Sequence, residues 1–191
     1  NISKMIKSSY IENILKSAVN NGATIYHFTP SMIHILALYA VRSGCPVPNL
    51  RYAICGTSRL PPTDKANFEE VFHTPVLQQY GTTEALIMSI NTSKDNQHPE
   101  SVGTPVGCSI QIVQDDGKGL GTNITGNIVV KSDANFGCYY KQPAETALAY
   151  KNGWFQTGDV GLITNDGHLI ISGRKKDIIK KSGININPSQ I

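Results

Sequence analysis

Two short segments of the chain combine a glycine with small hydroxyl side chains directly after an apolar run. Residues 56–58 (Gly-Thr-Ser) follow the run 52–55, and residues 81–83 (Gly-Thr-Thr) follow the run 76–80. Glycine lets backbone N–H groups approach a ligand closely, and with the hydroxyls these donors suit a phosphate or the face of a nucleotide base. Taken alone, such a segment is more often only a tight connection between two elements.

The elements around these segments are expected to be strands that alternate with helices. Apolar residues at helical spacing predict a helix over 11–19, which Asn21 and Gly22 end. The other predicted elements are strands at 24–28, 52–55 and 76–80, and helices from Pro30 to Gly44, from Pro61 onward and over 84–88. This alternation indicates a parallel α/β sheet, in which ligands bind beyond the carboxyl ends of the strands. Both glycine segments are therefore expected at the same edge.

The chain after Asn91 is expected to be rich in β-strands, because short alternating runs are broken by Gly, Asp and Asn. Residues 165–167 (Asn-Asp-Gly) are a strong β-hairpin signal. The predicted fold class is therefore α/β, a parallel α/β sheet followed by a β-rich subdomain. Strands are predicted at 110–113, 128–131, 161–164 and 168–172.

The composition excludes several classes of protein. The 191 residues carry 17 basic and 14 acidic side chains, a net charge of +3 that is too small to indicate nucleic acid as a partner. The four cysteines have no CxxC spacing, so free thiols in a reducing cytoplasm are expected rather than a zinc site or disulfides. The sequence has neither the ~18 consecutive apolar residues of a membrane span nor the layout of a signal peptide. A cytoplasmic protein without a membrane span is expected.

Three motifs in one order carry a family resemblance. They are residues 80–84 (Tyr-Gly-Thr-Thr-Glu), 154–159 (Trp-Phe-Gln-Thr-Gly-Asp) and 173–177 (Gly-Arg-Lys-Lys-Asp), with residues 56–60 upstream. In this order and spacing they resemble the adenylate-forming, or AMP-binding, superfamily, which includes acyl-CoA synthetases, luciferases and nonribosomal-peptide adenylation domains. Residues 102–107 and 137–146 are similar to the acyl-CoA synthetase branch.

The resemblance implies an architecture and a reaction. Residues 1–95 would be the C-terminal part of the AMP-binding sheet in the family's large N-terminal domain, and residues 96–172 its β-rich subdomain. Residues 173–191 would hold the hinge and the truncated start of the small C-terminal domain. The chain would then be a fragment of an ATP-dependent ligase that converts a small-molecule carboxylic acid to acyl-AMP and transfers the acyl group to coenzyme A. Apolar residues at 24–39 and 86–88 favour a fatty or aromatic acid.

By resemblance, residues from all these motifs hold the nucleotide. The loop 56–58 and the ring of Tyr80 would sandwich adenine, and Asp159 would accept hydrogen bonds from both ribose hydroxyls, which one carboxylate can do. Arg174 would add donors to the ribose or to the phosphate. A turn aspartate is the alternative for Asp159. The implied nucleotide-binding residues are Gly56, Thr57, Ser58, Tyr80, Gly81, Thr82, Thr83, Asp159 and Arg174.

The implied catalytic residues are Thr83, Glu84 and Lys180. Thr82 and Thr83 would approach the α-phosphate of ATP, where their donors can follow developing charge. Glu84 would hold Mg²⁺, for which a carboxylate is a hard oxygen ligand, and the alternative is an acid that starts a helix. Lys176 would be the hinge of the small domain, and Lys180 would act in the second half-reaction. The lysine run also fits a solvated face.

Several positions depart from the family pattern. Thr57 stands where many relatives have Gly or Ala, residues 122–127 replace a Pro-Gly-Glu-x-Gly-Glu turn, and Gln190 stands where Glu is common. The phosphate loop ending in Pro-Lys and the C-terminal adenylation lysine are not found, so the isolated chain is expected to be inactive. The alternatives are an adenylation domain that loads a carrier protein and a noncatalytic AMP-binding module. A homo-oligomer is left open.

Overall fold

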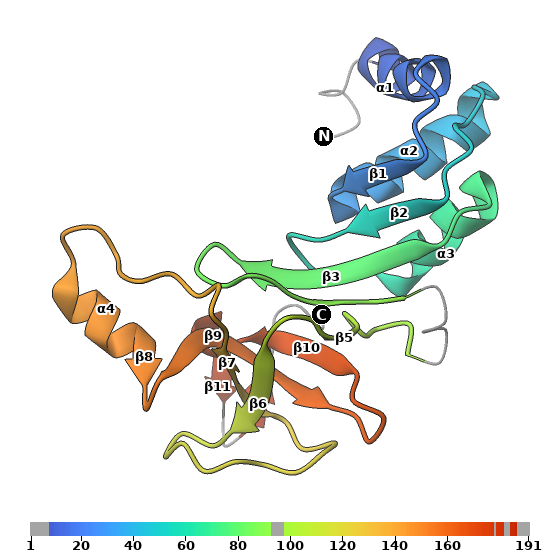
Figure 1. Cartoon of the computed structure of the whole chain (residues 1–191). Helices are drawn as coiled ribbons and strands as arrows, with labels where there is room; N and C mark the ends of the chain where they lie inside the picture. Colours follow the sequence, from blue (N-terminus) through green and yellow to red (C-terminus); the bar gives the residue numbers. More distant parts are fainter. Residues whose placement is uncertain (1–7, 93–97, 178, 182–183, 187–191) are drawn as a thin grey trace. The chain divides into compact units, whose positions relative to one another are not determined.

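The structure, a computed structural model, describes residues 8–92, 98–177, 179–181 and 184–186. The chain divides into two compact units, each with a buried core of its own. Helices and parallel strands form the first unit, and antiparallel strands dominate the second (Figure 1). The first unit comprises Asn1–Gln79 and Thr92–Glu100, and the second comprises Tyr80–Asn91 and Ser101–Ile191.

Parallel strands connected by helices make up the first unit. Strand β1 (Ile25–Phe28) pairs in parallel with β2 (Tyr52–Cys55), and β2 pairs in parallel with β3 (Val76–Thr82). The alternation of strand and helix confirms the predicted parallel α/β sheet. Strand β3 begins in the first unit and ends in the second. The helices are α1 (Ser8–Asn20), α2 (Pro30–Ser43) and α3 (Pro62–Phe72).

Helix α2 begins and ends where its sequence predicts. The Thr29 hydroxyl accepts a hydrogen bond from Met32 N at 3.3 Å, and Pro30 occupies the first turn, where its missing N–H costs no helical hydrogen bond. Gly44 ends the helix in the left-handed conformation, at φ 61°. The core on which the helices and strands of this unit pack includes Phe28, Ile33, Leu36, Phe68 and Val76.

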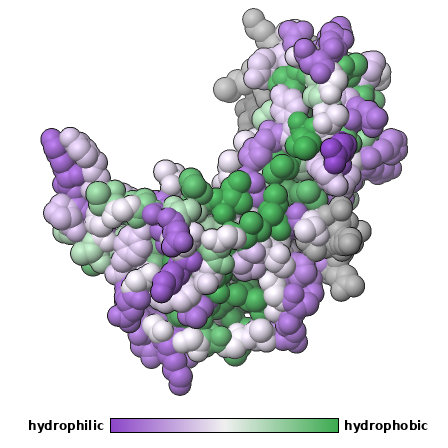
Figure 2. Space-filling view, in the orientation of Figure 1, coloured by the Kyte–Doolittle hydropathy of each residue, from purple (hydrophilic) through white to green (hydrophobic). Residues whose placement is uncertain are grey.

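Helix α1 is amphipathic, as the spacing of its apolar residues predicts. Ile11, Leu15 and Ala18 are buried. Hydrophilic residues gather over the outer surface of the helix, at the top of Figure 2. No helix in the described part of the chain is long and apolar enough to cross a membrane.

The four cysteines are free thiols, one buried, two half-buried and one exposed. Cys55 is buried in β2, and burial raises the pKa of its thiol to about 11. Cys138 is exposed. Cys108 donates a hydrogen bond to the Met88 carbonyl at 3.2 Å, and burial raises its pKa as well. A thiol held protonated by burial is a weak nucleophile, so Cys55 serves packing.

An antiparallel sheet forms the centre of the second unit, in the order β10-β9-β7-β6, with β8 paired to β9. This confirms the predicted β-rich section. The central strand β9 carries Phe155 and Asp159 to the buried face, while Trp154 and Gln156 alternate to the other. The strands are β6 (Ser109–Val113), β7 (Gly126–Lys131), β8 (Tyr150–Lys151), β9 (Trp154–Ile163) and β10 (Leu169–Arg174).

The remaining elements of the second unit are short. Strand β4 pairs antiparallel with β5, and β11 with β12. A single 3₁₀ turn follows β10 directly. These short elements are β4 (Leu86–Ile90), β5 (Thr104–Pro105), α4 (Pro143–Ala149), the 3₁₀ turn η2 (Lys175–Asp177), β11 (Ile179–Lys181) and β12 (Ile184–Ile186).

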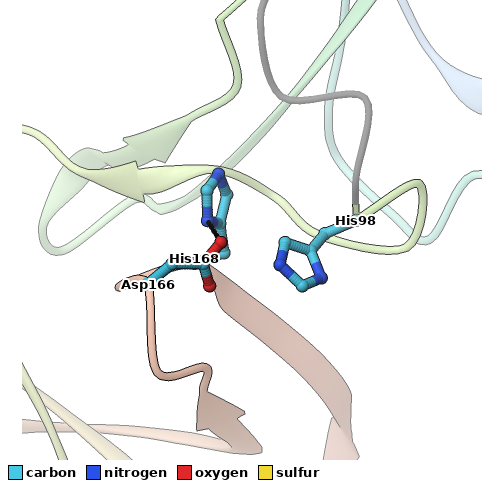
Figure 3. A group of neighbouring side chains, drawn as sticks. All are labelled: His98, Asp166 and His168. Carbon is cyan, nitrogen blue, oxygen red and sulfur yellow. Dashed lines mark ion pairs between the residues drawn. The ribbon is translucent and has the colours of Figure 1, made fainter.

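The predicted hairpin at residues 165–167 joins β9 to β10. The Thr164 hydroxyl donates to Asp166 Oδ1 at 2.5 Å and accepts from His168 N at 2.9 Å. His168 Nδ1 lies 3.3 Å from Asp166 Oδ2, the ion pair marked in Figure 3. His98, drawn in the same figure, belongs to the first unit. These local bonds stabilise the turn that the Asn-Asp-Gly sequence predicts.

One prediction of secondary structure is wrong. Residues 84–88 do not start a helix, because the chain turns after Thr82 and Leu86 begins strand β4 with a left-handed φ of 56°. A Cβ at Gly81 would lie 2.2 Å from the Leu86 carbonyl oxygen, so this reversal requires glycine. Asp159 lies inside the ten-residue strand β9, so the alternative of a turn aspartate is wrong. Helix α4 was not predicted.

Candidate functional site

Three of the predicted nucleotide-binding residues meet within the second unit. Tyr80 Oη donates a hydrogen bond to Asp159 Oδ2 at 2.6 Å, and Arg174 Nε donates to Asp159 Oδ1 at 3.1 Å. The register of the sheet explains the second contact, because Arg174 in β10 pairs with Asp159 in β9. A bulge between Ile171 and Gly173 adjusts that register just before Arg174.

Burial sets the electrostatics of this cluster. Asp159 is only 5% exposed, whereas the Arg174 side chain is half exposed. Burial, and then the neighbouring Asp159 carboxylate, raise the pKa of Tyr80 far above its usual value, so its hydroxyl stays a donor at any physiological pH. The Thr157 hydroxyl accepts a hydrogen bond from Asp159 N at 3.0 Å and holds the backbone of the strand.

The Asp159 carboxylate keeps capacity for a ligand. A carboxylate has about four lone-pair positions on its two oxygens, and Tyr80 and Arg174 each occupy one of them. Among the residues that the structure describes, no other donor bonds to these oxygens, so one position on each is left, which matches the two neighbouring hydroxyls of a ribose. The two protein donors also compensate the charge of a buried carboxylate, which would otherwise be costly.

The residues that follow Tyr80 form a tight turn. Thr82 Oγ1 accepts a hydrogen bond from Ala85 N at 3.2 Å, and the Thr83 side chain is exposed. Glu84 Oε1 accepts a hydrogen bond from Tyr139 Oη at 2.9 Å. Within the described residues, Glu84 forms no ion pair with a cationic side chain. A half-buried carboxylate without a cationic partner fits the oxygen donor that Mg²⁺ prefers.

The first glycine segment lies in the other unit, after the carboxyl end of β2. Thr57 adopts a left-handed φ of 80°, an outlier for a β-branched residue, and this coincides with the family departure at that position. A Cβ at Gly56 would meet the Gln79 side chain at 2.9 Å. The Gly56 backbone thus packs closely against the Gln79 side chain.

The two predicted lysines lie after β10. Lys176 is exposed in the 3₁₀ turn η2. The turn is tied to the sheet by its first residue, since Lys175 Nζ lies 2.5 Å from Asp115 Oδ1. Lys180 lies in β11, and its side chain falls outside the described part of the structure. Gln190 also lies outside the described residues.

Sequence reasoning missed Tyr139 as part of this site. It lies 55 positions from Glu84, its hydrogen-bond partner. The only sequence signal was its place in the stretch 137–146, which resembles the acyl-CoA synthetases without indicating a role for any one residue.

The chain is similar to enzymes that activate carboxylic acids. The family described as AMP-binding enzyme matches residues 5–140. A probable CoA ligase, CCL9, from Humulus lupulus is 33% identical over 174 residues, 89% of this chain and 33% of that protein. An oxalate–CoA ligase from Arabidopsis thaliana is 33% identical over 175 residues, 89% of this chain and 34% of that protein. The chain thus spans about a third of the length of these curated relatives.

Solved structures agree with this similarity. The amide bond synthetase McbA from Marinactinospora thermotolerans superposes with a TM-score of 0.86 at 26% identity, covering 97% of this chain and 38% of that one. The O-succinylbenzoate coenzyme A synthetase MenE from Bacillus subtilis, in complex with AMP, gives 0.84 at 25% identity, covering 94% of this chain and 37% of that one. These matches confirm the fold class predicted for the chain.

Proposed function

Because this chain belongs to the family of AMP-binding enzymes, we propose that it carries the nucleotide-binding part of an ATP-dependent acyl-CoA ligase. The observation that supports this most is the buried Asp159 carboxylate, held by Tyr80 and Arg174 with one acceptor position left on each oxygen. Such a carboxylate can accept both hydroxyls of a ribose at once.

Each residue of the cluster takes one part in holding the nucleotide. Asp159 accepts the two ribose hydroxyls, and Arg174 fixes the carboxylate while its remaining N–H groups are directed to the ribose or the phosphate. The face of the Tyr80 ring stacks on the adenine. Tyr80 can do this while its hydroxyl stays on Asp159, because stacking uses the face of the ring and the hydrogen bond uses its edge.

The reaction we propose begins with attack of a substrate carboxylate on the α-phosphate of ATP, which gives acyl-AMP and pyrophosphate. The thiol of coenzyme A then attacks the acyl carbon, and AMP leaves. Thr82 and Thr83 place hydroxyl and backbone donors near the α-phosphate, and Glu84 holds the metal. Bound Mg²⁺ supplies positive charge that offsets the charge building on the phosphates. Lys176 is the proposed hinge, and Lys180 acts in the second half-reaction.

The acid is proposed to be fatty or aromatic. Leu86 and Ile87 are 61% and 52% exposed, so they offer apolar surface directly after Glu84. Met88, expected beside them, is fully buried in the core and cannot line a substrate tunnel. The relatives are named for acids of several kinds, among them oxalate, 3-hydroxybenzoate and a long-chain fatty acid. The assay described below therefore compares these three acids as substrates.

A second candidate differs only in the acceptor. The similarity to an amide bond synthetase supports an amine in place of the coenzyme A thiol. Either acceptor attacks the same acyl-AMP, so the nucleotide site described above serves both reactions. A carrier-protein thiol is the third acceptor of this kind.

An assay of the two half-reactions tests the proposal. The protein would be prepared at the length of its relatives, and acid-dependent pyrophosphate release from ATP measured with oxalate, 3-hydroxybenzoate and a long-chain fatty acid. Coenzyme A and a simple amine would then be compared as acceptors by product mass. We expect pyrophosphate release with an apolar acid and a thioester with coenzyme A. AMP binding without pyrophosphate release for any acid would favour the noncatalytic module instead.

A further inference from the structure

We propose that Tyr139 is a positioning residue that orients the Glu84 carboxylate toward the metal ion. The inference rests on the proposed function, because it assumes that Glu84 holds Mg²⁺. It assigns a role to a residue of the segment between β7 and α4, which the three sequence motifs do not include.

One short segment holds Glu84 at both its backbone and its side chain. Phe136 N donates to the Glu84 carbonyl at 2.7 Å, and Tyr139 Oη donates to Glu84 Oε1 at 2.9 Å. A glutamate side chain otherwise has three rotatable bonds, and restricting them is costly in entropy. With its backbone and Oε1 both held, the second oxygen of Glu84 has a defined direction.

The segment that holds Glu84 is itself anchored in the core of the second unit. The Phe136 ring lies 4.6 Å from that of Tyr139 and 5.7 Å, edge to face, from that of the buried Phe155. Tyr139 N donates to the Thr146 hydroxyl of helix α4 at 3.0 Å. Tyr139 is therefore a fixed donor rather than a mobile surface side chain.

The chemistry of a tyrosine suits this task better than that of a cation. A lysine or arginine at this place would orient Glu84 but also neutralise the charge that attracts Mg²⁺. The phenol donates a hydrogen bond without carrying charge, so the carboxylate keeps its full attraction for a dication.

The metal-dependent part of ATP affinity separates a positioning role from a structural one. The dissociation constant of ATP for the chain would be measured by calorimetry with Mg²⁺ and with EDTA. The ratio of the value in EDTA to the value in Mg²⁺ is the metal-dependent gain in affinity, and it would be compared among variants. We expect Tyr139→Phe to lower the metal-dependent gain about 10-fold, as is typical when a partner of a metal ligand is removed, and to leave ATP binding in EDTA unchanged. Glu84→Gln should abolish the gain.

Tyr150→Phe is the matched control. The Tyr150 hydroxyl donates to the Phe136 carbonyl at 2.5 Å, so its loss disturbs the same aromatic cluster without touching Glu84. We expect the metal-dependent gain to be unchanged in this variant, even where the free energy of unfolding falls. An equal loss in Tyr139→Phe and Tyr150→Phe would show a structural effect and overturn the inference.

The remaining outcomes distinguish the inference from the proposed function. A metal-dependent gain that Glu84→Gln abolishes and Tyr139→Phe leaves intact would overturn the inference alone. Wild-type chain that binds ATP equally with Mg²⁺ and EDTA would contradict the metal role of Glu84, and with it the inference. No binding of ATP under either condition would contradict the nucleotide site itself.

Discussion

At the scale of single residues, the proposed nucleotide site depends on two carboxylates that accept hydrogen bonds from neutral or cationic donors. Asp159 is buried and accepts hydrogen bonds from Tyr80 and the cationic Arg174, whereas Glu84 accepts one from the neutral Tyr139 and forms no ion pair with a cationic side chain in the described part of the chain. The difference matches their proposed partners. A ribose needs an acceptor in a defined place, and a dication needs an uncompensated negative charge.

Removing the Asp159 carboxylate tests the ribose role directly. We expect Asp159→Ala to weaken AMP binding by about 1.5–3 kcal/mol, the scale of hydrogen bonds to a charged group. Isothermal titration of the chain with AMP measures it, and circular dichroism checks that the variant is folded. Asp133→Ala, at an exposed position of the same unit, is the control and should bind like the wild type. A folded Asp159→Ala chain with unchanged affinity would sink the assignment.

At the scale of the elements, tight chain reversals bring the functional side chains to their places. The turn between β3 and β4 presents Thr82, Thr83 and Glu84, and it forms only because residue 81 has no side chain. The pairing of β9 with β10 places Arg174 opposite Asp159. Helix α4 holds the backbone of Tyr139 through Thr146. The strands and turns thus decide which side chains meet.

A methyl group at position 81 tests the first of these turns. Gly81→Ala would put a Cβ 2.2 Å from the Leu86 carbonyl oxygen, a backbone atom that cannot move aside without distorting the turn. We expect a loss of about 3 kcal/mol in the free energy of unfolding, the upper range for overpacking. Urea denaturation measures it. At the exposed Gly137 an added Cβ meets nothing within 4 Å, so Gly137→Ala should cost much less. Equal stability of the two variants would contradict the close approach.

At the scale of the whole molecule, the chain has two units with separate cores, and the segment that begins with η2 after β10 belongs to the second unit. The ion pair from Lys175 to Asp115 fixes the start of this segment to the second unit. Lys176, the next residue of the turn η2, is exposed, so its side chain is not packed in the core. This supports the proposed hinge.

Restricting the backbone at Lys176 tests the hinge in the protein at the length of its relatives. We expect Lys176→Pro to spare acyl-AMP formation and to slow thioester formation at least several-fold, because proline fixes φ and so limits the rotation between half-reactions. Pyrophosphate release and thioester yield are measured separately. Lys176→Ala removes the same side chain and leaves φ free, so it should retain both steps. Equal loss of both half-reactions in Lys176→Pro would count against a hinge at this position.

The sequence alone determined the features that a few neighbouring residues encode. The α/β class, the ends of α2 at Pro30 and Gly44 and the hairpin at 165–167 were all predicted, because caps, turns and periodicity act over short distances. The motifs also identified Tyr80, Asp159 and Arg174, which the structure brings together. Their roles in binding remain predictions.

Only the tertiary structure decided which distant side chains share a site. The local sequence predicts a helix over residues 84–88. Strand pairing overrides this propensity, because β4 forms its backbone hydrogen bonds with a neighbouring strand rather than within its own segment. The contacts from Tyr80 to Asp159 and from Tyr139 to Glu84 join residues 79 and 55 positions apart. No spacing rule specifies such pairs, because they depend on the register of strands and on where a loop is anchored in the core.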